Sequence, residues 1–218
     1  MPLTIRFMRR QDISQVTEID HHAFPTEWPP TNFLHELANK LAYYIIAYEN
    51  QDTKPQSDPG PSDREKQLGF FKRIRGILLR SQTTPKNELE EVPIVGYAGM
   101  WIMADEAHVT SIASHKEYRH KGIGEALLIS LIELAIKKQA NIVSLEVRVS
   151  NQVAQNLYYK FGFDKVGLRK AYYLDNKEDA VIMSTEYIGS PSFREKFTLV
   201  KQAYYLRWGA FTNELLVS

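Results

Sequence analysis

The sequence VTSIASHKEYRHKGIGEALL at residues 109–128 contains the clearest structural pattern in the chain. Its first five residues are mostly β-branched or apolar and predict a buried strand, the charged middle predicts a loop, and the end begins a strongly periodic helix. In such a unit the first backbone N–H groups of the helix point into one concavity, where the helix dipole adds partial positive charge. Glycine at positions 122 and 124 lets a phosphate approach closely because it carries no Cβ atom. The pattern therefore predicts an anion site.

The spacing of the two glycines excludes two common kinds of phosphate site. The loop lacks the third glycine of the GxGxxG dinucleotide motif, and it lacks the Gly-Lys-Ser/Thr of a nucleoside triphosphate loop. An alternative to an anion site is a tight strand-to-helix turn that needs glycine only for steric reasons.

Local patterns elsewhere predict a mixed α/β domain. Alternating or apolar runs predict strands at 3–8, 42–48, 92–103, 106–114 and 142–149. Asp12 and Asn151 stand where a helix N-cap is expected, and Thr31 is placed to restart a helix after a proline-rich loop. Glycine at 96 and 99 suggests bulges or close backbone approach in the third strand.

Several motifs after the glycine loop, together with the loop itself, resemble a known family. Arg-x-x-Gly-x-Gly between a strand and a helix resembles the acetyl-CoA pyrophosphate loop of the GNAT superfamily of N-acetyltransferases. The ordered run that follows resembles the RimI branch of that superfamily, which acetylates the N-terminal amines of proteins. The residues of this run that carry the resemblance are Leu145-Glu146-Val147-Arg148, Asn151, Ala154, Leu157-Tyr158, Gly162-Phe163, Arg169, Tyr172-Tyr173 and Glu178-Asp179-Ala180.

The resemblance implies a fold and a cofactor. The fold would be α/β (α+β), with a mixed, mostly antiparallel central sheet that is splayed between strands 4 and 5 and has helices on both faces. Acetyl-CoA would lie with its pantetheine in the wedge between those strands. The residues implied to bind it are Ile112, Ala113, Ser114, Arg119, His120, Lys121, Gly122, Ile123, Gly124, Glu125, Ala126, Asn151 and Tyr158.

Two residues are implied to carry the chemistry. Glu146 would be the general base, acting directly or through water, and Tyr158 would protonate the departing thiolate. The alternative for Glu146 is an ordinary strand carboxylate paired with Arg148 or a nearby lysine. The alternative for Tyr158 is core packing, and Tyr159 beside it could be confused with it. Holding the amine close to the thioester would supply much of the acceleration.

The acceptor side of the site is implied by a different set of residues. Phe24 and Trp28 belong to the loop at 22–31, which forms one wall of the acceptor groove in the resembled family, although they could equally pack as a lid on the core. Arg148, Tyr172 and Asp179 are the other candidates. Because Tyr172 and Tyr173 alternate faces, only one of them can look into the groove. His108, His115 and His120 show no metal-ligand spacing and no carboxylate partner in the sequence, so no metal site is expected.

Composition excludes several other classes of protein. The chain of 218 residues has 27 Lys and Arg against 26 Asp and Glu, so its overall charge does not predict binding to DNA or RNA. It has no cysteine, which excludes disulfides, thiolate zinc sites and a cysteine nucleophile. No apolar run approaches the roughly 20 residues of a membrane span, and residues 1–6 lack the apolar region of a signal peptide, so a cytoplasmic location is expected.

The resemblance covers residues 1–187, which would form the acetyltransferase domain, interrupted by an insertion at 50–91. The first part of the insertion predicts a disordered loop, and 68–80 predicts a short basic amphipathic helix. That helix could contact the ribosome or a membrane surface, but docking of its apolar stripe on its own domain is favoured.

Residues 188–218 predict a C-terminal helical extension. Ser192-x-x-Glu195 resembles a capping box, and Phe193, Phe197, Val200 and Tyr204 would share one face of the helix up to about Arg207. This face could pack on its own domain, on the insertion helix or on a second subunit, and the sequence leaves that choice and the oligomeric state open.

The function implied is direct acetyl transfer from acetyl-CoA to a primary amine in a ternary complex, since the chain has no cysteine to carry an acyl group. The preferred acceptor is the N-terminal amine of a protein such as a ribosomal protein. The alternatives are a small-molecule amine or a lysine side chain, and a non-catalytic domain that senses acetyl-CoA. The presence of both Glu146 and Tyr158 argues against the non-catalytic alternative.

Overall fold

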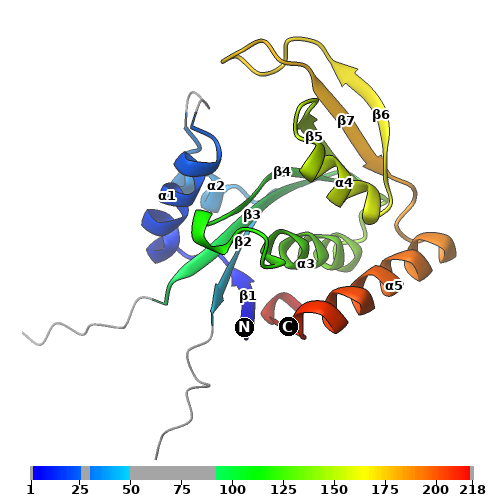
Figure 1. Ribbon diagram of the computed structural model, residues 1–218, viewed down its shortest axis with the longest axis horizontal. Coiled ribbons are helices and arrows are strands. Elements are labelled where there is room, and N and C mark those ends of the chain that lie inside the picture. Colours follow the sequence, from blue (N-terminus) through cyan, green and yellow to red (C-terminus); the bar gives the residue numbers. More distant parts are fainter. Residues whose placement is uncertain (1, 26–29, 50–91, 217–218) are drawn as a thin grey trace, which may run out of the picture. The chain divides into compact units, whose positions relative to one another are not determined.

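The computed structural model describes residues 2–25, 30–49 and 92–216 (Figure 1). Trp28 and the insertion helix expected at 68–80 lie outside these residues. The described part forms one eight-stranded sheet in the order β6-β7-β5-β4-β3-β2-β1-β8. The strands are β1 (Leu3–Phe7), β2 (Ala42–Glu49), β3 (Ile94–Met103), β4 (Glu106–Ser114), β5 (Ile142–Arg148), β6 (Phe163–Arg169), β7 (Ala180–Thr185) and β8 (Thr212–Asn213).

The sheet is mixed and mostly antiparallel, as the sequence predicted. Among the strand pairs of the described residues, only β4 with β5 and β1 with β8 are parallel. The α-helices are α1 (Ile13–Ala23), α2 (Phe33–Ala38), α3 (Ile123–Lys137), α4 (Gln152–Lys160) and α5 (Pro191–Trp208). The described ranges also contain three short 3-10 helices, η1 (Arg10–Asp12), η2 (Lys116–Tyr118) and η3 (Glu214–Leu216).

Helices cover both faces of the sheet, and β2 shows how. Ile45 and Ala47 belong to the core cluster that contains the buried side chains of α3. Tyr44 and Ile46 belong to a second cluster, which contains buried side chains of α1 and α2. Because alternate residues of a strand point to opposite faces, these two clusters lie on opposite sides of the sheet. The GNAT-like architecture implied by the sequence is therefore confirmed.

Three helix caps differ from the sequence-based prediction. At α2 the cap is Asn32 and not Thr31, because the Asn32 Oδ1 accepts from the His35 N–H at 3.1 Å. The Asp12 carboxylate makes no side-chain cap for α1, because it accepts two hydrogen bonds from the Arg6 guanidinium, at 2.7 and 3.0 Å, and one from the Arg9 N–H at 2.6 Å. At α5 the cap is Ser190, whose Oγ accepts from the Phe193 N–H at 3.1 Å. Pro191 then occupies the first helical position, for which its fixed φ and missing N–H are suited. The capping box expected at Ser192 was therefore wrong by two residues.

The C-terminal extension packs on its own domain. Phe193, Phe197 and Tyr204 are buried in the same cluster as α3. Beyond α5 the chain returns to the sheet, where β8 pairs with β1. In Figure 1, α5 lies beside α3 on the same side of the sheet.

Candidate active site

The sheet opens between β4 and β5. The two strands pair in parallel from Glu106 with Ile142 to Val109 with Leu145 and no further. At the same position the register of β4 with β3 shifts, so that β4 carries one extra residue, Thr110, and is bulged. Beyond this point β4 and β5 make no backbone hydrogen bonds with each other. The N–H and C=O groups on their facing edges therefore need another partner. The wedge expected from the sequence is therefore present.

The glycine loop turns from the open end of β4 into α3. Gly122 is the N-cap of α3 with φ 79° and ψ 3°, in the left-handed region that favours glycine, and no side chain caps this helix. The first N–H groups of α3 are therefore presented without a protein side-chain acceptor at the cap. Ile112, Ala113 and Ser114 form the end of β4, directly before η2 and the loop.

The charged residues of this loop differ in their surroundings. Arg119, His120 and Lys121 are exposed, and the Lys121 ammonium lies 4.5 Å from the centre of the Tyr118 ring. Glu125 in the first turn of α3 accepts from Lys160 of α4 at 2.6 Å. The N-terminus of α3 thus lies beside two exposed cations, Arg119 and Lys121, and beside the Glu125 carboxylate, whose charge Lys160 neutralises. The N-terminus of the helix is therefore electropositive.

Asn151 caps α4, as predicted. Its Oδ1 accepts from the Ala154 N–H at 3.1 Å, and the residue is exposed. Its amide N–H₂ group points away from that contact and can donate to a ligand.

Glu146 lies on β5 one residue beyond the last residue paired with β4, and its side chain is 8% exposed. His108 Nε2 is 3.0 Å from Glu146 Oε2, and an Arg169 guanidinium nitrogen is 3.0 Å from Oε1. Because a carboxylate can only accept, Nε2 carries the proton in the contact with His108. Both oxygens of Glu146 are thus held by donors from other strands, His108 from the neighbouring β4 and Arg169 from the end of β6, which lies beyond β7.

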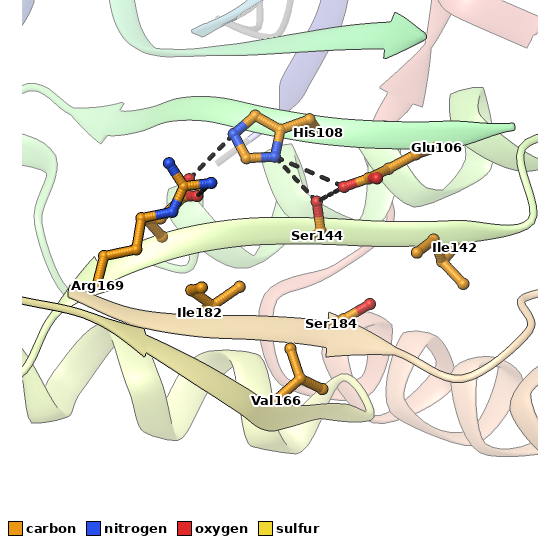
Figure 2. A pocket seen from close by; sticks show the side chains of 9 residues that line it. Glu106, His108, Ile142, Ser144, Val166, Arg169, Ile182 and Ser184 are labelled. Atoms are coloured by element: carbon orange, nitrogen blue, oxygen red, sulfur yellow. Dashed lines mark hydrogen bonds and ion pairs between the residues drawn. The ribbon is translucent and has the colours of Figure 1, made fainter. Parts of the chain in front are cut away.

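The network continues away from Glu146 along β4 and β5 (Figure 2). His108 Nδ1 lies 2.9 Å from the Ser144 oxygen, and the Ser144 hydroxyl donates its one hydrogen to Glu106. These side chains line an open pocket of about 180 Å³ on the face of β5 that points away from α3. The remaining lining residues are Ile142, Val166, Ile182 and Ser184.

The surroundings keep Glu146 ionised. The hydrogen bond from His108 lowers the pKa of the Glu146 carboxyl below its usual value, although burial works in the opposite direction. The charges of His108 and Arg169 add to the lowering. Glu146 is therefore not paired with Arg148, the alternative that the sequence left open.

Tyr158 of α4 lies on the other side of the sheet. It is buried, and its ring centre lies 5.7 Å from that of Phe163. Burial raises the pKa of Tyr158, and the nearby Tyr173 phenol adds to the effect, so the hydroxyl keeps its proton at neutral pH. Tyr159, the residue with which it could be confused, is 42% exposed.

Arg148 organises the segment between β6 and β7. Its guanidinium binds Asp175 at 3.0 and 3.1 Å, Glu178 at 3.1 Å and the Asn176 side-chain oxygen at 3.2 Å. It also lies 3.8 Å from the centre of the Tyr173 ring. Arg148 therefore fixes residues 173–178 over the end of β5.

The remaining acceptor-side candidates are placed as follows. Tyr172 is 41% exposed, and its ring meets that of Tyr173 edge-on at 5.2 Å, so the two rings do not point to opposite faces. The expected alternation fails because both residues follow the end of β6 at Arg169. Asp179 directly precedes β7, and its Oδ1 accepts from the Ala171 N–H at 2.8 Å, so it fixes the start of this segment. Phe24 follows α1 and packs, partly buried, against the cluster of α1 and α2.

The sequence showed no carboxylate partner for His108, but the structure gives it one, Glu146. Arg169 and Tyr173 belong to the run that resembles the family, but the sequence assigned neither of them a contact with Glu146. Burial raises the pKa of Tyr173 to about 12, the Arg148 charge opposes this, and the charges of Tyr172 and Glu146 add to the rise. In the structure His108 stands two residues before the bulge and Glu146 one residue after the pairing ends, so both flank the opening of the parallel pair, and the sequence carries no signal of either position.

The comparisons with known proteins agree with this geometry. Residues 52–163 match the model of the Acetyltransferase (GNAT) family. A Bacillus subtilis protein named putative [ribosomal protein bS18]-alanine N-acetyltransferase is 36% identical over 180 residues, which cover 82% of this chain and 92% of that protein. The chain belongs to the GNAT acetyltransferase family.

Two solved structures show the same fold as this acetyltransferase. The ribosomal-protein-S18-alanine N-acetyltransferase of Escherichia coli has a TM-score of 0.58 at 22% identity, over 85% of this chain and 94% of that one. The PaiA N-acetyltransferase of Thermoplasma acidophilum, solved in complex with coenzyme A, has a TM-score of 0.53 at 17% identity, over 86% of this chain and all of that one, 100%.

This GNAT acetyltransferase is an acyltransferase that uses acetyl-CoA as its donor. The wedge offers unpaired strand edges to an extended pantetheine, and the uncapped α3 N-terminus offers N–H groups to phosphate. The wedge therefore suits the pantetheine of acetyl-CoA, and the α3 N-terminus suits its phosphate groups. In the described residues, no helix is long and apolar enough to cross a membrane.

Proposed function

We propose that this acetyltransferase modifies the N-terminal α-amine of a protein, such as a ribosomal protein. The observation that carries the proposal is the ionised Glu146 at the opening of the wedge, with both of its oxygens occupied by His108 and Arg169. The relative from Bacillus subtilis, which is named a putative [ribosomal protein bS18]-alanine N-acetyltransferase, supports the same choice of acceptor.

The basicity of Glu146 favours an α-amine over a lysine side chain. The pKa of this carboxylate is lowered, so it is a weak base. An α-ammonium group has a pKa of about 7.7–8.0 and a lysine ammonium group about 10.4. Deprotonating lysine would therefore cost about 3.4 kcal/mol more, because each pK unit corresponds to about 1.36 kcal/mol. A weak base suits the more acidic amine.

The chain's own groups then have separate tasks. Residues 112–114 and 119–126, with Asn151, would hold the donor, and Arg148 with Tyr172 and Tyr173 would form the acceptor side. When bound, acetyl-CoA supplies a thioester carbonyl that an amine can attack. Glu146 would take the proton of the amine, directly or through water, while His108 and Arg169 hold its oxygens. Tyr158, which keeps its proton at neutral pH, would give that proton to the leaving sulfur.

The experiment is acetyl-CoA-dependent thiol release with three classes of acceptor. One class contains short peptides with free N-termini that begin with alanine, serine or methionine. The second contains the same peptides with a blocked N-terminus and one internal lysine, and the third contains small polyamines.

Turnover confined to free N-termini supports the proposal and gives the sequence preference. Turnover of the blocked lysine peptides or polyamines at equal or higher kcat/KM would overturn the choice of acceptor while keeping the N-acetyltransferase activity. Coenzyme A binding by calorimetry without turnover of any acceptor, including a purified ribosomal subunit, would favour the sensing domain instead.

A further inference from the structure

Polar contacts fix the C-terminal extension to the C-terminal half of α3. Lys201 of α5 pairs with Glu133 of α3, and Asn213 donates to the same carboxylate at 2.7 Å. The Lys137 ammonium donates to the carbonyl of Leu215 at 3.1 Å. Lys201 meets Glu133 in the C-terminal half of α3, and the last residue of α5 lies against Gly122 at the other end, so α5 runs back toward the N-terminus of that helix.

The last residue of α5, Trp208, reaches the glycine loop. A Cβ atom added to Gly122 would lie 2.9 Å from each of three atoms of the five-membered ring of Trp208, namely Cγ, Cδ1 and Cε2. This distance is below any normal carbon–carbon contact, so the indole face occupies the space that a side chain at position 122 would need. The contact is with the left-handed residue at which the loop turns into α3.

Two further observations concern how the indole is held. The Arg207 guanidinium lies 4.8 Å from the Trp208 ring centre, which is within the range of a cation–π contact. The indole Nε1 is buried and has no hydrogen-bond partner in the described part of the chain. The ring is therefore placed by packing, and a phenylalanine at this position would lose no hydrogen bond.

The second glycine of the loop is in a different position. A Cβ atom added to Gly124 would meet only Leu157 Cδ2, at 3.9 Å. The space beside Gly124 is thus left open, whereas the space beside Gly122 is filled by α5. The protein itself occupies one side of the glycine loop and leaves another side accessible.

We infer that Trp208 is a positioning residue for the acetyl-CoA site. By filling the space over Gly122 it holds the left-handed turn in the conformation that presents the first N–H groups of α3, so residues 188–218 support the cofactor loop. This inference rests on the proposed role of residues 119–126 in binding the donor. If the loop is already ordered before acetyl-CoA binds, the entropy cost of ordering it is not part of binding. The affinity for acetyl-CoA is therefore higher.

The test compares four variants for coenzyme A affinity by calorimetry, for steady-state kinetics, and for thermal stability. Trp208→Ala should raise the KM for acetyl-CoA and the dissociation constant of coenzyme A by roughly tenfold, with kcat within about twofold, because it affects loop order and not the chemistry. Trp208→Phe should restore most of the affinity. Phe197→Leu is the matched control, because it removes packing from the same helix away from the loop and should lower stability without changing the KM.

The fourth variant separates this inference from the proposed site. Gly124→Trp fills the open side of the loop and should abolish coenzyme A binding if residues 119–126 hold the donor. If Gly124→Trp abolishes binding while Trp208→Ala binds coenzyme A like the wild type, the positioning role is wrong and the proposed site stands. If Gly124→Trp binds normally, the proposed site itself is wrong. If Phe197→Leu raises the KM as much as Trp208→Ala, a general loss of stability explains both, and the positioning role is wrong.

Discussion

The Nε2 atom of His108 lies 3.0 Å from Oε2 of Glu146 and joins two parallel strands at the point where they separate. His108 pairs with Ser144 in the strand register, and Glu146 stands one residue beyond the last paired position. The imidazole therefore crosses from β4 to a carboxylate at the mouth of the wedge. This contact holds the proposed base in place and keeps it ionised, because a hydrogen bond to the charged form of a carboxyl favours that form.

Removing His108 should raise the pKa of Glu146. The hydrogen bond from His108 is the largest cause of the lowered pKa, and without His108 the opposing effect of burial is the largest of the causes that remain. In His108→Ala the side-chain carboxyl carbon of Glu146, followed by NMR, should titrate at a higher pH than in the wild type. We expect kcat to fall by at least about tenfold, because the freed carboxylate is no longer held in one orientation.

His35→Ala is the control for this experiment, since that ring is exposed on α2 and its side chain is 76% accessible. It should change neither the titration nor kcat. An unchanged Glu146 titration in His108→Ala would show that the contact does not control the carboxylate.

Arg169→Gln should shift the Glu146 pKa in the same direction but by less. The Arg169 charge ranks behind both effects of His108, and the arginine side chain is 54% exposed. Solvent and salt screen an exposed pair, so the shift should shrink further when the ionic strength is raised from about 0.01 to 1 M. The same NMR titration at two salt concentrations measures this, and a shift that is larger than that of His108→Ala or independent of salt would contradict it.

Glu146→Gln should reduce kcat by roughly 10²–10⁴-fold with little change in the affinity for coenzyme A. It should also change the dependence of stability on pH. Because the folded-state pKa of Glu146 is lowered, its ionisation stabilises the fold above the unfolded-state pKa of about 4.3, and this contribution is lost as the pH falls through the folded-state value.

The stability of the Gln variant should therefore fall less than that of the wild type between neutral pH and about pH 3, because its amide does not titrate. Urea denaturation at several pH values measures the free energy of unfolding. Parallel curves for the two proteins would rule out a lowered pKa at Glu146, and an unchanged kcat would remove this residue as the base.

Features that depend on local sequence could be predicted well. The glycine loop, the strand at 142–148 and the Asn151 cap follow from periodicity, glycine placement and capping chemistry within a few residues. The splay between β4 and β5 was also predicted, but only because the motifs resemble a known family. Its physical marker, the extra residue at Thr110, leaves no pattern in the sequence that separates it from a regular strand.

Features that depend on distant partners could not be predicted. Asp12 has the usual position of a helix cap, but a bidentate contact with Arg6 is stronger than a cap and takes its carboxylate. The partnership of His108 with Glu146 depends on the parallel register of two strands that are far apart in the chain, and a shift of that register by two residues would remove it. The packing of Trp208 on Gly122 likewise depends on where α5 docks.

Arg148→Ala should loosen the segment between β6 and β7. The guanidinium holds Asp175 and Glu178 together and covers the Tyr173 ring, so its loss leaves two carboxylates without their cation. The KM for a peptide acceptor should rise by roughly 5- to 50-fold while the KM for acetyl-CoA stays unchanged, because only the acceptor side loses order.

Limited trypsin digestion should cut Arg148→Ala faster at Lys170 and Lys177, which lie in this segment. Arg148→Lys is the matched variant, since it keeps the charge but not the planar fork that binds two carboxylates, and it should give an intermediate result. A rise in the KM for acetyl-CoA alone, with unchanged proteolysis, would contradict this assignment of Arg148 to the acceptor side.

Alanine at the two glycines of the loop should have opposite effects on stability. Gly122→Ala places a Cβ on a residue with φ 79° and against the Trp208 ring, so we expect a loss of about 1–2 kcal/mol for the backbone conformation and about 1–3 kcal/mol for overpacking. Gly124→Ala meets nothing closer than 3.9 Å within a helix and should be neutral or stabilising by up to about 1 kcal/mol.

Urea denaturation gives the free energy of unfolding of each single variant and of the double variant that combines Gly122→Ala with Trp208→Ala. Comparing them separates the backbone cost of Gly122→Ala from its overpacking cost. Without the indole the overpacking disappears and the backbone cost stays, so Gly122→Ala should destabilise the Trp208→Ala protein less than it destabilises the wild type. The two substitutions are in direct contact and should therefore be non-additive. Additive free energies would mean that the ring does not press on Gly122, and the left-handed conformation alone would then explain the glycine.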